Sequence, residues 1–114
     1  MNITKIARPF FLRRAKEIEL YNNETVAIQR RVLRRLLQKA QDTDYGRNHS
    51  FITVASYEQF VQNVPVNGYD DLKGDIERMR HGEENILWPG QVKWYAKSSG
   101  TTNDKSKFIP VSND

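Results

Sequence analysis

Cysteine is absent from the 114-residue chain, and histidine is scarce. Without cysteine there is no disulfide, thiolate metal site or cysteine nucleophile, and a reducing compartment is allowed. The two histidines, His49 and His81, lie far apart in the sequence and form no helical pair, so we do not expect a histidine-rich metal site. We predict a protein without a metal site of its own, located in the cytoplasm.

Long apolar runs are also missing. No run approaches the roughly 20 residues that span a bilayer, and residues 1–21 lack the uninterrupted apolar core of a secretory signal. Only 38% of the residues are hydrophobic, and the mean hydropathy of −0.75 is low for a self-sufficient fold. Aromatic and aliphatic residues are nevertheless too frequent for a disordered chain. We therefore expect no membrane partner, and either one modest core or a piece of a larger domain.

Acidic residues are outnumbered: 18 lysines and arginines face 14 aspartates and glutamates, which gives a net charge of +4. Such an excess attracts nucleic acid, anionic lipid or nucleotide phosphate. Because the chain shows no recognised nucleic-acid motif, a mildly basic enzyme segment is the favoured interpretation. Nucleic acid is not an expected partner.

Apolar residues at helical spacing predict four helices, the first over residues 3–21. Pro9 either opens this helix at its first turn or kinks a longer one. The basic residues after the two phenylalanines permit a membrane-surface or targeting helix, but packing on the rest of the protein is the commoner use of such a stripe. The stripe consists of Ile3, Ile6, Ala7, Phe10 and Phe11.

The second helix is predicted over residues 24–41, with leucines on one side and Arg30, Arg31, Arg34 and Arg35 on the other. Residues 42–49 form a turn-rich connection. The S-x-x-Q sequence from Ser56 opens a third helix, which ends before Pro65. A fourth helix covers residues 69–81 and stops at Gly82.

Two short strands are predicted near the end of the chain, over residues 92–96 and 108–111. Pro110 indicates a sheet edge or a strand end. Residues 112–114 have the character of a helix cap. Since two short strands do not make a stable sheet alone, we expect them to belong to a larger sheet.

The segment between the strands, residues 97–107, combines hydroxyls, one glycine, turn-prone residues and lysines. A glycine-containing loop presents backbone N–H groups to phosphate, and a lysine neutralises polyphosphate charge. The spacing is not that of a Walker A motif. Because any surface turn has a similar composition, the loop alone leaves phosphate binding and a plain turn both open.

A longer ordered series of motifs resembles the N-terminal region of the GH3 (auxin-responsive promoter) family over roughly residues 20–114. These proteins are acyl-acid amido synthetases related to acyl-adenylate-forming enzymes. The loop and the return strand resemble the family's first ATP-phosphate motif. The upstream stretches that carry the resemblance are Gln29–Leu37, Thr43–His49, Ser56–Phe60, Val64–Val66, Tyr69–Leu72, Ile76–Met79 and Gly82–Glu83.

The resemblance implies an α/β enzyme that is mainly helical in this segment. Residues 1–84 would form a helical N-terminal layer, and residues 85–114 would start the ATP-binding core as a strand, phosphate loop and strand of a larger sheet. It also implies Mg-ATP, a carboxylic acid and an amine as reactants, joined through an acyl-adenylate. The residues carried over to ATP-phosphate binding are Ser98, Ser99, Gly100, Thr101, Thr102 and Lys107.

Two departures from the family are visible. Many members have glycine where this chain has Asn103 or Asp104, and members are several times longer, with most substrate contacts downstream of the loop. We therefore expect no catalytic residue within this segment, and a catalytically silent, marginally folded chain in isolation. The alternatives are a small basic helical module that binds nucleic acid or an acidic surface through the four arginines, and a non-catalytic remnant of the synthetase family.

Overall fold

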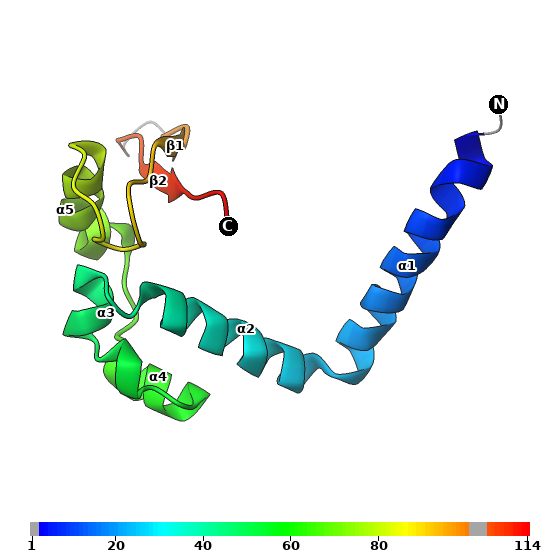
Figure 1. Ribbon diagram of the computed structural model, residues 1–114. Coiled ribbons are helices and arrows are strands. Elements are labelled where there is room, and N and C mark those ends of the chain that lie inside the picture. The colour runs from blue at the N-terminus through cyan, green and yellow to red at the C-terminus, as the bar shows by residue number, and fades with distance from the viewer. Residues whose placement is uncertain (1–2, 101–104) are drawn as a thin grey trace. The chain divides into compact units, whose positions relative to one another are not determined.

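The computed structural model describes residues 3–100 and 105–114 (Figure 1). The chain divides into two compact units, residues 1–33 and residues 34–114, and the division falls within the second helix. In chain order the elements are α1 (Ile3–Asn23), α2 (Thr25–Ala40), α3 (Asp44–Asn48), the 3-10 turn η1 (Phe51–Thr53), α4 (Tyr57–Asn63), α5 (Tyr69–Arg80), β1 (Trp94–Lys97) and β2 (Phe108–Val111).

Helix α1 begins at Ile3 and contains Pro9 in its interior, so of the two alternatives for Pro9 the longer helix is observed and the opening of the helix at Pro9 is not. No residue of α1 is buried. Ile3 remains 74% exposed and Phe10 69% exposed, so nothing among the described residues 3–33 covers these parts of the apolar stripe. The predicted packing of this stripe on the rest of the protein stays a prediction.

Residues 44–48 form the short helix α3 where the sequence predicted only a turn-rich connection. The cause is Thr43, which is only 1% exposed and caps the helix. Its hydroxyl donates to the carbonyl of Ala40 (2.7 Å) and accepts from the backbone N–H of Gly46 (3.0 Å). The prediction of four helices is therefore corrected to five α-helices within residues 3–100.

Local capping contacts set the starts of α4 and α5, and the sequence predicted the one at Ser56. The Ser56 hydroxyl accepts from the Gln59 N–H (3.2 Å), and the Gln59 side chain accepts from the N–H of Ala55 (2.7 Å). The Asp71 carboxylate accepts from the N–H of Gly68 (2.7 Å) and satisfies one of the unpaired donors at the start of α5. Gly82 then ends the helix with φ +93°, a conformation that glycine adopts without a steric cost.

The core of the second unit lies under α5 and the segment that follows it. Met79, Ile86 and Val92 are buried together, and Leu87, Trp88 and Tyr95 pack against them. Burial of each such side chain contributes roughly 1.5–3 kcal/mol. This small core fixes the base of the hairpin that carries the predicted loop.

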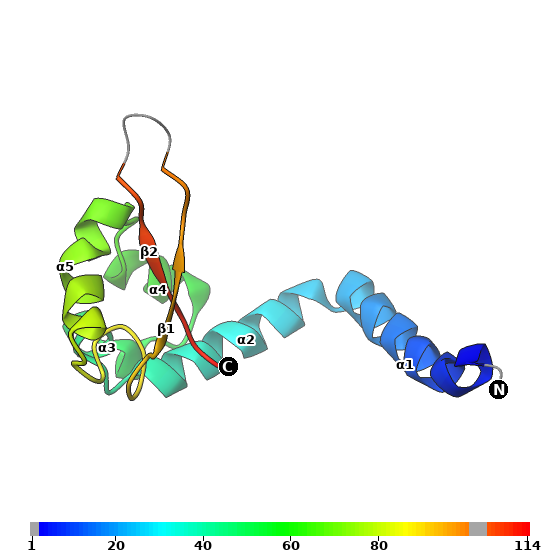
Figure 2. The same ribbon diagram turned by 90° about the horizontal axis from the view of Figure 1, so that it is seen from above.

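Strands β1 and β2 form a two-stranded antiparallel sheet, with Trp94 opposite Val111 and Lys97 opposite Phe108. Helix α5 lies beside β2 (Figure 2). The second strand has its predicted bounds, whereas the first begins two residues later than predicted. Pro110 lies within β2 opposite Tyr95, and it is tolerated because both strands of this sheet are edges.

The described part of the chain is thus mainly helical with one small sheet, which confirms the coarse fold prediction. Among the described residues, each helix is too short or too polar to cross a lipid bilayer.

Candidate functional site

Ser98 and Lys107 close the hairpin at the end that carries the predicted loop. The Ser98 N–H donates to the Lys107 carbonyl (2.9 Å). In return, the Lys107 N–H donates to the Ser98 hydroxyl (3.1 Å). Both residues are half-buried, whereas Ser99 and Gly100 are exposed. Two of the six predicted phosphate-binding residues are therefore in direct contact.

Of the other four predicted phosphate-binding residues, the structure describes two. Ser99 and Gly100 directly follow Ser98, and both are exposed to solvent. Thr101 and Thr102 lie outside the described residues. The assignment of the set to phosphate binding stays a prediction.

Helix α5 contacts the residue that follows Lys107. The Tyr69 hydroxyl accepts from the N–H of Phe108 (2.9 Å). The Arg80 guanidinium lies 3.6 Å from the centre of the Phe108 ring, which is a cation–π arrangement. Sequence reasoning assigned no site role to Tyr69 or Arg80, although their spacing places both on one face of the helix.

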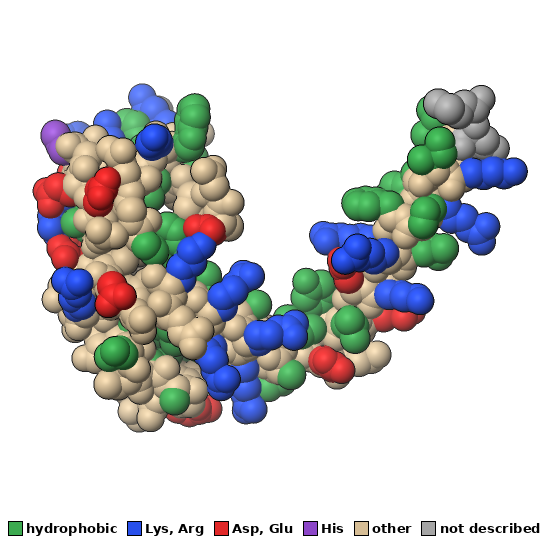
Figure 3. Space-filling model, in the orientation of Figure 1, with side chains coloured by type: hydrophobic (Ala, Val, Ile, Leu, Met, Phe, Trp, Pro, Cys, Tyr) green, Lys and Arg blue, Asp and Glu red, His purple; other side chains and the backbone are tan. Residues whose placement is uncertain are grey.

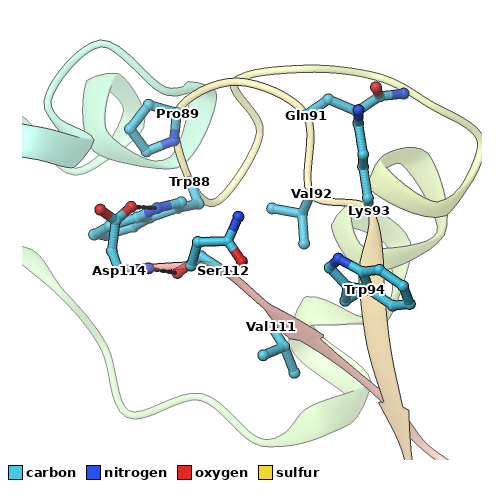
Figure 4. Close-up of a pocket in the computed structure, with 10 residues that line it drawn as sticks. Trp88, Pro89, Gln91, Val92, Lys93, Trp94, Val111, Ser112 and Asp114 are labelled. Atoms are coloured by element: carbon cyan, nitrogen blue, oxygen red, sulfur yellow. Dashed lines mark hydrogen bonds between the residues drawn. The ribbon is translucent and has the colours of Figure 1, made fainter.

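A cavity of about 250 Å³ opens on the other end of the hairpin (Figure 4). In it, the Trp88 indole N–H donates to the Asp114 carboxylate (3.1 Å), and Lys39 forms an ion pair with the same carboxylate. The Lys39 ammonium, and next the Trp88 indole, hold the pKa of Asp114 below its ordinary value. The lining residues are Trp88, Pro89, Gln91, Val92, Lys93, Trp94, Val111, Ser112, Asn113 and Asp114.

A larger cavity of about 400 Å³ shares Trp88, Ser112 and Asp114 with the first and adds Arg35, Leu36 and Lys39 from α2. The Lys39 ammonium lies 5.6 Å from the centre of the Trp88 ring. The Asp114 carboxylate pairs with Lys39, and Arg35 adds a second cation to the lining. Of the predicted phosphate-binding residues that the structure describes, which are Ser98, Ser99, Gly100 and Lys107, none lines either cavity.

Arg78 joins α5 to its surroundings through carboxylates. It pairs with Asp44 (2.8 Å), Glu83 (2.9 Å) and Asp75 (3.4 Å). The hydrogen bonds that the Arg78 guanidinium donates to Asp44 and, next, to Glu83 raise the pKa of Arg78 above its ordinary value. The pair with Asp44 connects α5 to the start of α3, whereas the pairs with Asp75 and Glu83 lie within α5 and just after it.

The four arginines of α2 are all exposed. Figure 3 shows lysine and arginine side chains gathered over this helix. Their exposure fits a solvated face as well as an anion-binding face. In the described residues, no group of three or more histidine, aspartate or glutamate side chains is placed to hold a metal ion.

Comparison with known proteins decides the family. Residues 14–114 match the GH3 family N-terminal domain. The chain belongs to the GH3 family. The resemblance predicted from the motifs is thereby confirmed for a GH3 N-terminal region.

Three similar proteins come from plants and are named as amido synthetases. Probable indole-3-acetic acid-amido synthetase GH3.2 of Oryza sativa subsp. japonica is 34% identical over 89 residues, which cover 77% of this chain and 14% of the relative. Indole-3-acetic acid-amido synthetase GH3.3 of Arabidopsis thaliana is 32% identical over 85 residues, which cover 74% and 14%. GH3.5 of the same plant is 30% identical over 95 residues, which cover 82% and 16%. The GH3 chain described here therefore spans about a seventh of the length of these relatives.

Proposed function

We propose that this GH3 chain is the N-terminal part of an ATP-dependent acyl-acid amido synthetase. The match of residues 14–114 to the family's N-terminal domain carries the proposal, and the names of the curated relatives give the amide-forming reaction. In the proposed reaction a carboxylic acid is activated by Mg-ATP as an acyl-adenylate with release of pyrophosphate, and an amine then takes the acyl group. Indole-3-acetic acid, named in the relatives, is the first acid to test.

In this proposal the loop between β1 and β2 binds the β- and γ-phosphates. The Ser98 hydroxyl accepts from the Lys107 N–H, so its own O–H remains available as a donor to a phosphate oxygen. The Lys107 ammonium offsets phosphate charge, and the exposed backbone of Ser99 and Gly100 supplies further N–H donors. Thr101 and Thr102 are proposed to add hydroxyl donors.

Mg²⁺ would enter with the nucleotide. The donor set at the closing pair is a hydroxyl and an ammonium, which suits phosphate oxygens and not a cation. Mg²⁺ is usually held by one or two carboxylates together with substrate phosphates. We therefore assign to the described residues the binding of phosphate and not the binding of the metal.

The exposed apolar face of the β1–β2 hairpin supports a position for this chain at the start of a larger α/β enzyme. Residues 1–84 would form the helical N-terminal layer and residues 85–114 the start of the ATP-binding α/β core. Trp94, Ile109 and Val111 are 69%, 51% and 45% exposed, and the strand register puts them on one face of the sheet. Such an apolar face suits packing inside a larger α/β core.

Titration of the isotopically labelled chain with Mg-ATP, followed by NMR, tests phosphate binding. We expect amide shifts at Ser98, Ser99, Gly100 and Lys107. Lys107→Gln should weaken ATP binding roughly tenfold, because a charge-assisted contact is lost. Lys73→Gln removes the same charge from an exposed position on α5 and should leave binding unchanged. Equal weakening by both variants would refute the assignment of the loop.

A second candidate function is binding of an anionic polymer by the exposed arginines of α2. If it holds, RNA or DNA affinity falls steeply with salt concentration. Replacing Arg30, Arg31, Arg34 and Arg35 by glutamine would abolish it, and Lys107→Gln would not. Binding that is weak and insensitive to these four substitutions would eliminate this candidate.

A further inference from the structure

We infer that α5 positions Lys107 by holding the next residue, Phe108, between Tyr69 and Arg80. The inference rests on the proposed function, since it assigns these two side chains to the orientation of the lysine that faces the nucleotide phosphates. We call Tyr69 and Arg80 together the α5 clamp. Neither residue is proposed to touch the nucleotide, so both are positioning residues.

The helix geometry makes the clamp possible. Tyr69 is the first residue of α5 and Arg80 the last. Eleven residues correspond to about three turns, so the two side chains leave the same face of the helix about 16 Å apart along its axis. Long side chains on this face can therefore reach the same residue of β2, and both contact Phe108.

Tyr69 fixes the backbone of β2. Its hydroxyl accepts the N–H of Phe108 at 2.9 Å, and its ring lies 5.7 Å from the Lys107 ammonium. A single hydrogen bond of this kind places the peptide between Lys107 and Phe108 at a set distance from α5. Because this peptide carries the Lys107 carbonyl, the bond also fixes the partner of the Ser98 N–H.

Arg80 fixes the side chain of the same residue. Its guanidinium stacks at 3.6 Å on the ring of Phe108. Glu77, one turn earlier, pairs with Arg80 at 2.7 Å and keeps the guanidinium in place. Phe108 is half-buried, whereas Arg80 is exposed, so the stacked cation covers the ring from the solvent side.

Lys107 is thus held from two sides. Ser98 pairs with both of its backbone groups, and the α5 clamp holds Phe108 next to it. The position of the lysine is set by residues that lie 27 and 38 positions earlier in the sequence, in addition to the loop itself. A change in α5 is therefore expected to alter phosphate binding without touching the loop.

The experiment uses the labelled 114-residue chain and two readouts. The first is amide hydrogen exchange at Phe108 and Lys107, and the second is affinity for tripolyphosphate measured by NMR. Tyr69→Phe should accelerate Phe108 exchange and weaken tripolyphosphate binding, each about threefold to tenfold, because one hydrogen bond is lost. Arg80→Gln should weaken binding about threefold, and Arg80→Lys should restore most of it because the cation is retained.

Tyr57→Phe is the matched control, because Tyr57 is an exposed tyrosine of α4. Unchanged Phe108 exchange in both Tyr69→Phe and Arg80→Gln would overturn the clamp, provided that circular dichroism shows the native helix content. A third result separates the two proposals. If the variants exchange Phe108 faster but the wild-type chain does not bind tripolyphosphate, the clamp is supported and the proposed function is overturned.

Discussion

At the scale of single residues, Gly46 shows how closely α3 approaches the end of α2. A Cβ at this position would lie 2.1 Å from the carbonyl oxygen of Ala40, which is a backbone atom and cannot swing away. We predict that Gly46→Ala lowers the free energy of unfolding by about 3 kcal/mol, because the backbone must shift. Urea unfolding measures the change.

Gly74 provides the control for this substitution. A Cβ there meets nothing within 4 Å, and the residue lies in the middle of α5. Gly74→Ala should raise the free energy of unfolding by about 0.5–1 kcal/mol, since alanine has the higher helix propensity. Similar effects of the two glycine substitutions would contradict the packing described for α3.

Tyr95 carries a buried hydroxyl that has no hydrogen-bond partner among the described residues. Burial raises the pKa of Tyr95 above 10.0, and Arg80 opposes the increase. The folded state thus favours the neutral phenol. This contribution to stability is present below pH 10 and is lost as the pH rises beyond it.

We therefore predict that Tyr95→Phe increases stability by about 1 kcal/mol at neutral pH, because an unsatisfied buried group is removed. The variant should also lose less stability than the wild type between pH 9 and pH 11. Thermal melts across this range measure both effects. A variant less stable than wild type at neutral pH would mean that the hydroxyl has a partner in solution.

At the scale of elements, α3 depends on one buried cap. Thr43→Val keeps the volume of the side chain but leaves the Gly46 N–H without its acceptor. We expect a loss of about 2 kcal/mol in the free energy of unfolding. Thr53→Val removes a similar hydroxyl contact at an exposed position of η1 and should cost far less. Denaturant titration of both variants tests the role of the cap.

The sequence predicted the elements that carry strong local signals. The cap at Ser56 and the stop at Gly82 each depend on residues that are close in the sequence, so the start of α4 and the end of α5 were predictable. Helix α3 was not, because its cap depends on burial of Thr43. The start of β1 was misplaced since Val92 belongs to the core that precedes the strand and not to the strand itself.

The candidate site was predictable only in part, because some of its contacts join residues that are far apart in the sequence. The loop residues stand together in the sequence, and the pairing of Ser98 with Lys107 follows once two strands flank them. The contacts of Tyr69 and Arg80 with Phe108 join positions 39 and 28 residues apart. No local pattern specifies such contacts, because they arise from the packing of α5 against β2.

At the scale of the whole molecule, charge is distributed unevenly between the two units. Residues 1–33 contain seven lysines and arginines and three glutamates, whereas residues 34–114 contain eleven residues of each sign. The entire net charge of +4 therefore belongs to the first unit. We predict that retention of the chain on a cation exchanger falls sharply when residues 1–33 are removed, because the remaining unit is neutral overall. Equal retention would show that a local patch of the second unit dominates.

The central claim is that the chain supplies the phosphate loop of an amido synthetase, and a chimera tests it most directly. The matched N-terminal region of the rice relative is replaced by residues 14–114 of this chain, and acid-dependent exchange of pyrophosphate into ATP is measured with indole-3-acetic acid. We predict exchange in the chimera, a loss of roughly a hundredfold in Lys107→Gln, little change in Lys73→Gln, and none in the isolated 114-residue chain. A folded chimera that exchanges no pyrophosphate, or one in which Lys107→Gln is as active as Lys73→Gln, would contradict the account.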